Sequence, residues 1–181
     1  KLGEIQCLED TIPSYSCEIP STAEYDFTLL GWSKTLGGEK LDNLPAATGN
    51  ATYYAVKKET KRKYVISFKN EDGSDYKDVE VEYGLIPSVA NPSKAKDQQY
   101  SYSFAGWSLT KGGEVLDSLP TVSGVATYYA NFEGTLNKYS VTLVLDNGSE
   151  NIISYVDVGT EYYQPENPSK SGYTFEGWYK D

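Results

Sequence analysis

The sequence predicts a mostly β protein, α+β at most, made of tandem small repeats with little helix. Three observations carry this prediction. The chain matches itself at a shift of 75 residues, the matching blocks alternate apolar and polar side chains, and tyrosine is frequent, at 17 of 181 residues with no methionine. Tyrosine suits half-buried strand positions, because its ring packs while its hydroxyl reaches water.

The self-match divides the chain into units. Tyr25–Tyr64 and Tyr100–Tyr139 align without a gap and share 21 of 40 residues. Tyr64–Lys94 matches Tyr139–Lys170 more loosely, with one inserted residue. A fixed period of this kind is typical of a repeat array. The predicted units are a first repeat at 1–62 with an incomplete opening strand block, a complete middle repeat at 63–137, and a last repeat at 138–181, truncated after its Gly-Trp box.

The middle repeat opens with a predicted β-hairpin. Tyr64–Lys69 and Asp75–Tyr83 alternate apolar and polar residues, and Asn70–Ser74 between them is rich in turn-forming residues. Gly84–Lys94 contains two prolines, so we expect a crossing segment there instead of a central strand. One short helical turn is an option at Pro92–Lys94.

Two further strands complete the predicted unit. Tyr100–Ala105 alternates cleanly, and Ala126–Phe132 forms the last strand. In the first repeat the last strand is Ala51–Lys57, where Lys57 replaces the aromatic Phe132, so we expect that strand to end sooner or to pack less. The last repeat lacks this final strand, which would leave a sheet edge open to pairing with another chain.

All three tryptophans directly follow a glycine. Strand alternation would place Trp107 on the face opposite Phe104, and a β-bulge at Gly106 would return it to the same face. Leu29 would take the place of Phe104 beside the first tryptophan. The predicted structural core is therefore Trp32, Trp107, Trp178, Phe104 and Phe175. The alternative is an exposed aromatic platform for a sugar.

Charge and hydropathy exclude some partners. The net charge is −10, and an acidic surface repels phosphate backbones, so we expect no nucleic-acid partner. The basic run Lys57–Lys63 is an exception, which we interpret as a solvated linker, with a polyanion-binding patch as the alternative. No apolar run is long enough to cross a bilayer, so no membrane span is expected in this fragment.

The sequence shows no catalytic constellation, although carboxylates are plentiful, with 26 Asp and Glu residues. The chain has no histidine, which excludes Ser-His-Asp and Cys-His nucleophiles and histidine-ligated metals. The carboxylates lie on alternating strand faces and in turns, as solvated charges do. Asn70–Asp75 and Asp146–Glu150 resemble loose calcium loops without the full ligand spacing, so plain turns are expected. We predict no enzyme, no catalytic residue, no metal site and no cofactor.

Cys7 and Cys17 are the only cysteines. Two cysteines without histidine do not make a zinc site, which needs four ligands. A disulfide between Cys7 and Cys17 is possible in an oxidising compartment, and two free thiols are the alternative.

Three tyrosine doublets motivate a binding hypothesis. Successive strand residues point to opposite faces, so one ring of each doublet must face outward. The candidate exposed binding aromatics are Tyr54, Tyr129 and Tyr163. If the outward rings cluster with Trp107 in one groove, binding gains support, and if they scatter it loses support.

The order of these motifs resembles the Listeria–Bacteroides repeat, the B-repeat of internalin-type surface proteins. Asn167–Lys180 matches its box most closely, and Phe104–Trp107 with Thr127–Phe132 carries the resemblance in the middle repeat. The resemblance implies tandem β-grasp-like domains, without catalytic residues, on secreted or wall-anchored bacterial proteins.

The resemblance also implies a function. The chain would be a non-catalytic stalk or spacer with a part in adhesion, located outside the cell at the bacterial surface or cell wall. Its partners would be the neighbouring repeats and a host-surface protein or glycan. The alternative is a module that itself binds glycan or host protein through exposed tyrosine and tryptophan.

Overall fold

The computed structural model describes residues 2–180, which form eight strands and no helix. The prediction of a mostly β protein is confirmed, whereas its β-grasp-like character remains a prediction. The option of a helical turn at Pro92–Lys94 is wrong, since this segment is irregular. The strands are β1 Tyr25–Ser33, β2 Tyr54–Lys61, β3 Lys63–Lys69, β4 Asp75–Glu82, β5 Tyr100–Ser108, β6 Ala126–Leu136, β7 Lys138–Leu143 and β8 Ile152–Asp157.

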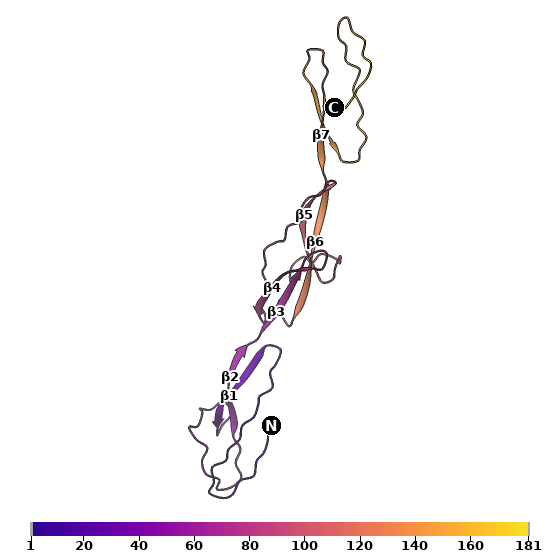
Figure 1. Cartoon of the computed structure of the whole chain (residues 1–181). Helices are drawn as coiled ribbons and strands as arrows, with labels where there is room; N and C mark the ends of the chain where they lie inside the picture. Colours follow the sequence, from indigo (N-terminus) through magenta and orange to yellow (C-terminus); the bar gives the residue numbers. More distant parts are fainter. Residues whose placement is uncertain (1, 181) are drawn as a thin grey trace.

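The molecule is a rod of three units (Figure 1). Its accessible surface is 13788 Å², whereas a compact monomer of this mass would expose about 8,700 Å². The first unit holds the antiparallel pair β1–β2, the middle unit a four-stranded sheet in the order β4-β3-β6-β5, and the last unit the antiparallel pair β7–β8. We call these the first, middle and last units.

The middle sheet combines two antiparallel pairs through one parallel contact. β3 and β4 form the predicted hairpin, and β5 pairs antiparallel with β6. β3 and β6 run parallel, with Ile66 opposite Ala126 and Lys69 opposite Tyr129. Because parallel neighbours need a crossover connection, Gly84–Lys94 and the segments around β5 carry the chain across the sheet.

The predicted bulge is present in β5. The register with β6 shifts between Phe104 and Gly106, and Gly106 has a φ of 143°. Beyond the shift, Trp107 packs against Phe104, with 5.2 Å between ring centroids, and against Phe68, at 4.7 Å. β1 has the same shift, between Leu29 and Gly31. The bulge therefore turns the indole towards the side of the sheet that carries the core.

The buried apolar core lies wholly in the middle unit. Among the described residues, the hydrophobic side chains classed as buried are Ile66, Phe68, Trp107, Val122, Tyr128 and Ala130. Phe68 and Tyr128 meet across the parallel contact, with 5.6 Å between ring centroids. The first and last units have half-buried aromatics in place of a closed core, since each lacks part of the four-stranded sheet.

β2 is longer than predicted. We expected the first repeat's last strand to end near Lys57, but β2 continues to Lys61. The Lys57 ammonium lies 3.7 Å from the centroid of the Phe27 ring on β1. A cation over a ring face, with the lysine stem along it, substitutes here for the ring–ring contact between Phe104 and Phe132, whose centroids are 5.9 Å apart.

The first unit keeps more of the repeat than its sequence indicated. The backbone N–H of Asp10 donates to Ala47 O at 3.0 Å, and Ala47 N–H donates to Thr11 O at 2.9 Å. In the middle unit the turn at Gly84 and Leu85 holds Val122 by the same pair of bonds, at 2.8 Å each. The shared Ile-Pro-Ser at 12–14 and 86–88 is the sequence signal for this match, which is too short to find alone.

The last unit preserves the Gly-Trp box without a strand partner. Residues 173–179 form no strand, yet Gly177 has a φ of 148° and Phe175 packs edge-on against Trp178 at 5.3 Å between ring centroids. These values resemble those of Gly106 and the Phe104–Trp107 pair. The box is therefore a local structure that the sequence forms by itself.

Candidate functional site

The described residues show no cluster of acidic or thiol side chains that could hold a metal ion. Residues 2–180 contain no group of three or more Cys, Asp or Glu side chains placed to hold a metal ion. No helix in this range is long and apolar enough to cross a bilayer. Two hollows are open at the surface, one in the first unit and one in the last.

The best-bonded carboxylates cap turns. The hydroxyl and N–H of Ser74 lower the pKa of Asp72. The N–H of Tyr100, the hydroxyl of Tyr102 and the N–H of Gln99 lower the pKa of Asp97. Both shifts keep the carboxylate charged, whereas a general acid needs a raised pKa. These groups stabilise loops, as the sequence predicted for the acidic turns.

The contacts between the units are the most regular feature of the chain. A single residue, Arg62, separates β2 from β3. Its backbone N–H donates to Glu24 O in the first unit, and its carbonyl accepts from Tyr83 N–H in the middle unit, both at 2.9 Å. The backbone N–H and C=O of this one residue are therefore hydrogen-bonded to two different units.

Asn137 has the same role between β6 and β7. Its N–H donates to Gln99 O at 2.8 Å, and its carbonyl accepts from Val158 N–H at 2.9 Å. All three residues lie 75 positions after their counterparts at the first junction. We name Arg62 and Asn137 the junction residues; they connect β2 to β3 and β6 to β7, where the rod of Figure 1 is narrow.

The junction side chains differ but reach equivalent acceptors. Arg62 donates from Nη1 to Thr22 O at 3.0 Å, and Asn137 donates from Nδ2 to Asp97 O at 2.8 Å. Asn137 Oδ1 also accepts from the Ser101 hydroxyl at 2.6 Å. The gapless self-match aligns Arg62 with Asn137, but the two side chains are chemically unlike, so the alignment alone gave no reason to expect the same role.

A tyrosine closes each junction from the following unit. The Tyr64 hydroxyl donates to Ala23 O at 2.6 Å, and the Tyr139 hydroxyl donates to Gln98 O at 2.9 Å. Both tyrosines are the first alternating residues of their strands. The sequence predicted them as strand residues and missed their role between units, because that role depends on where the preceding unit ends.

The cysteines are not paired. Cys7 is an exposed free thiol and Cys17 a half-buried one, and a disulfide between them remains a prediction. The loop between them is organised by its backbone bonds to Ala47, which fix the turn without a covalent link.

The candidate binding aromatics do not gather in one groove. Tyr54 is exposed on β2, Tyr129 is half-buried on β6, and Tyr163 is exposed in the loop after β8. Trp107, which would have joined them, is 7% exposed and lies in the core. Each doublet has its more buried ring first, although only Tyr128 and Tyr129 both lie in a strand, and the outward rings lie on three different units.

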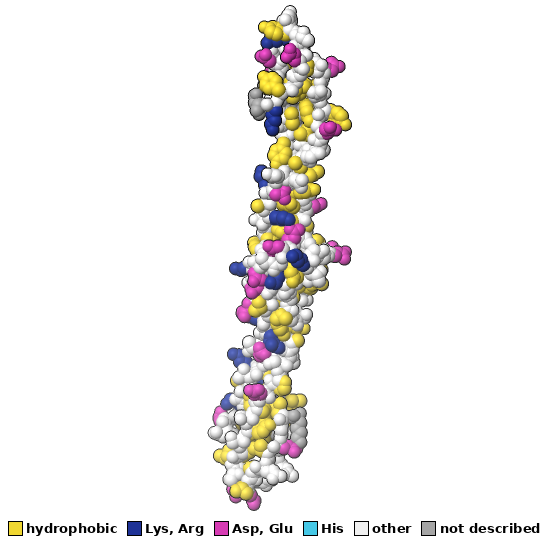
Figure 2. Space-filling view, turned by 45° about the vertical axis from the view of Figure 1, so that its right-hand side comes forward, with side chains coloured by type: hydrophobic (Ala, Val, Ile, Leu, Met, Phe, Trp, Pro, Cys, Tyr) yellow, Lys and Arg dark blue, Asp and Glu magenta, His cyan; other side chains and the backbone are white. Residues whose placement is uncertain are grey.

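The side chains on the surface are mixed in kind. Figure 2 shows acidic and basic side chains interspersed along the rod, with hydrophobic side chains exposed over both end units. The exposed apolar residues of the last unit include Val144, Ile153, Tyr155, Tyr163 and Tyr173.

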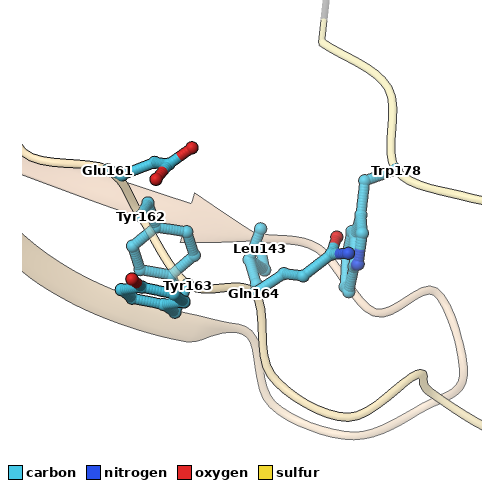
Figure 3. Close-up of a pocket in the computed structure, with 6 residues that line it drawn as sticks. All are labelled: Leu143, Glu161, Tyr162, Tyr163, Gln164 and Trp178. Carbon is cyan, nitrogen blue, oxygen red and sulfur yellow. The ribbon is translucent and has the colours of Figure 1, made fainter.

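One hollow combines several of these residues. A space of about 370 Å³ in the last unit is lined by Leu143, Glu161, Tyr162, Tyr163, Gln164 and Trp178. Figure 3 shows the two tyrosines at one end and Trp178 at the other, with Leu143 and Gln164 between them. The buried indole Nε1 of Trp178 has no hydrogen-bond partner among the described residues.

Comparison with known proteins identifies a relationship in the last unit. Residues 139–181 match the family model of the Listeria-Bacteroides repeat domain, which confirms the predicted resemblance for this stretch. A protein of Evansella cellulosilytica named "Putative Gly-rich membrane protein" is 36% identical over 126 residues, 65% of this chain and 13% of that protein.

A second Evansella cellulosilytica protein, named "Putative membrane protein", is 34% identical over 138 residues, 74% of this chain and 19% of that protein. The chain thus spans less than a fifth of the length of either relative. No solved structure matches.

Proposed function

We propose that this chain, whose residues 139–181 match the Listeria-Bacteroides repeat, is a rigid spacer in a surface-associated protein of the bacterial cell envelope. Two relatives that are named membrane proteins support the location. The rod shape supports the spacer role (Figure 1). The proposal assigns no reaction to the chain, in keeping with its lack of histidine.

The observation that carries the proposal is the repeated junction. Flexible linkers between domains are several residues long and make no bonds to either side. Here one residue joins two strands, and its N–H and C=O are bonded to different units. Bending at a junction would break several hydrogen bonds, each contributing about 1 kcal/mol. The units therefore keep one relative orientation.

Stiff junctions allow a repeat array to act as a spacer of defined length. In an array where each unit contacts only its neighbours, length grows in proportion to the number of repeats. Such a stalk would hold a distal domain away from the cell wall, and adhesion to a host protein or glycan would be the task of that domain. The net charge of −10 favours solubility of such a rod.

The test is a distance measurement between the end units. Cys7 and Cys17 are replaced by serine, and spin labels are attached to cysteines introduced at the exposed Asp42 and Glu150. Pulsed electron resonance then gives the distribution of label separations. We expect one narrow distribution, and a broad one in the unaltered junctions would contradict the spacer proposal.

A junction variant sharpens the test. Asn137→Gly removes the side-chain bonds to Asp97 and Ser101 and loosens the backbone, so the distribution should broaden. Asn91→Gly, at an exposed position in the crossing segment of the middle unit, is the matched control and should leave the width unchanged. Equal broadening in both variants would show that the junction does not set the stiffness.

A further inference from the structure

The parallel strands β3 and β6 connect the two ends of the middle unit. β3 directly follows the junction residue Arg62, and β6 leads directly into the junction residue Asn137. Residues 66–69 of β3 pair in parallel with residues 126–129 of β6. In Figure 1, β3 therefore continues from β2 at one end of the unit, and β6 continues into β7 at the other end.

Tension along the rod would load this strand pair in shear. A pull on the two junctions draws β3 towards the first unit from its first residue and draws β6 towards the last unit from its last residue. Because the strands are parallel, they are pulled from opposite ends and must slide past each other. All backbone hydrogen bonds of the pair then resist together, whereas a pull on the same end of both strands would break them one at a time.

The other two strands of the sheet move with these two. β4 pairs antiparallel with β3 in a hairpin, and β5 pairs antiparallel with β6. In the order β4-β3-β6-β5, the strand pairing between the two halves of the sheet is the one between β3 and β6. Tension along the rod therefore acts on the boundary between β3 and β6.

Side-chain packing across this boundary opposes sliding. Ile66 and Phe68 of β3 are each 1% exposed. The Phe68 ring packs against Tyr128 of β6, with 5.6 Å between ring centroids, and against Trp107 of β5, at 4.7 Å. Because the interior of a protein is closely packed, Phe68 cannot move along β6 without displacing these rings.

Two lysines that flank β5 hold the turn between β3 and β4. The Lys94 ammonium donates to Glu71 Oε2 at 2.5 Å, and the Lys111 ammonium donates to Asp72 O at 2.7 Å. Both bonds join one half of the sheet to the other, beyond the end of β3. Lysine contacts at the surface add little to equilibrium stability, but sliding of β3 would stretch both bonds at once.

We propose that the middle unit is a load-bearing module, in which β3 and β6 form a shear clamp against tension along the chain. The inference rests on the proposed spacer role, since a stalk transmits a pull on its distal domain to its base. It adds a resistance to unfolding under force, which stiffness without load does not require. The clamp consists of residues 66–69 and 126–129, with the rings of Phe68, Tyr128 and Trp107 packed across them.

The test stretches single molecules of the full chain in two directions with optical tweezers. Cys7 and Cys17 are replaced by serine, and handles are attached at cysteines introduced at the exposed Thr60 and Ser140 to apply shear. Handles at Thr60 and the exposed Ser123 pull instead on the same end of both strands. We expect the unfolding force to be at least about twofold higher in shear, because forced unfolding follows the unfolding rate along the loaded path. Equal forces in the two directions would overturn the proposal.

A matched pair of substitutions on β6 locates the resistance. Thr127→Gly weakens the strand opposite Ser67 within the clamp, and Thr135→Gly makes the same change opposite Ser101, where β6 pairs with β5 alone. Thr127→Gly should lower the shear force, and Thr135→Gly should leave it unchanged. Cooperative urea unfolding checks that both variants are folded. Equal lowering by both substitutions would place the resistance outside the clamp and contradict the proposal.

The forces and the label distances separate the clamp from the spacer role. A narrow distribution of label separations together with equal forces in the two directions would leave a stiff spacer and overturn the clamp. A broad distribution together with a high shear force would contradict the spacer proposal and support the clamp.

Discussion

At the scale of single residues, glycine and its backbone angle decide where the aromatic core forms. Gly31, Gly106 and Gly177 all have φ between 143° and 151°, and each precedes a tryptophan. Side-chain-bearing residues rarely adopt this angle, so the position favours glycine on backbone grounds alone. A local backbone requirement, met by one residue type, thus repeats through all three units.

Replacing these glycines separates backbone strain from crowding. A Cβ at Gly106 would lie 2.5 Å from Val115 Cγ1, whereas a Cβ at Gly177 meets nothing within 4 Å. Gly177→Ala should therefore cost only the backbone strain, about 1–3 kcal/mol. Gly106→Ala should cost about 1 kcal/mol more, because Val115 must move. Denaturant unfolding measures both changes.

Part of the stability lost in Gly106→Ala can be recovered by a further substitution. Val115→Ala removes the crowded methyl group, so the Gly106→Ala/Val115→Ala double variant should recover the crowding part of the loss, as a double-mutant cycle would show. Strict additivity of the two single changes would contradict the contact with Val115.

A second residue-scale prediction concerns acid stability. The N–H of Tyr100 lowers the pKa of Asp97, so the folded state binds this proton less tightly than the unfolded state. Stability from Asp97 is therefore complete above the unfolded pKa, near 3.9, and is lost as the pH falls through the lower folded pKa. Urea midpoints measured against pH should show this acid-side decline.

The first unit indicates which substitution of Asp97 would keep the turn. Thr22 occupies the place of Asp97, and its hydroxyl oxygen accepts from Tyr25 N–H at 2.9 Å, as Asp97 Oδ1 accepts from Tyr100 N–H at 2.7 Å. Asp97→Thr should keep the turn and remove its titration, which flattens the decline. An unchanged pH profile would show that other carboxylates cause it.

At the scale of elements, β6 links most of the structure. Its first half, Ala126–Tyr129, pairs with β3 on one side, and Tyr129 also pairs with β5 on the other. Its second half extends beyond β3 and pairs only with β5 as far as Leu136, next to the junction residue Asn137. One strand therefore closes the core and leads into the next unit.

Hydrogen exchange should reveal the two halves of β6. The amides near Tyr128 and Ala130 are buried in the core and should exchange only on unfolding of the middle unit. The amides of Glu133–Leu136 lie on a two-stranded, exposed ribbon and should exchange faster, by local opening. Amide exchange followed by NMR measures this, and uniform protection along β6 would contradict it.

At the scale of the whole molecule, stability is unevenly distributed. Every buried apolar side chain in the described range belongs to the middle unit, and the end units expose apolar surface. In a linear array, each unit's stability is the sum of its own term and its interface with the neighbours. The end units therefore depend on the junctions more than the middle unit does.

Excision of the units tests this division. Residues 63–137 alone should fold cooperatively, because they contain the four-stranded sheet and its core. Residues 1–62 and 138–181 alone should lack cooperative unfolding, because neither holds a closed core. Circular dichroism and thermal melts of the three pieces measure this, and cooperative folding of 138–181 alone would contradict it.

The sequence by itself determined the elements that depend on local patterns. Alternation located the hairpin and β5, the exact self-match indicated the period, and the bulge followed from Gly106 between Phe104 and Trp107. These features depend on residues close in the chain, so their physical cause is visible in the sequence. The position of Trp107 beside Phe104 is such a case.

Only the tertiary structure decided how the units contact each other and where β2 ends. Arg62 and Asn137 have no chemical likeness, and they act alike because their backbone groups bond to Glu24 and Gln99, both 38 positions earlier. The extension of β2 depends on Lys57 reaching Phe27 across the sheet. Each is a relation between distant segments, set by hydrogen bonds and packing that no local pattern encodes.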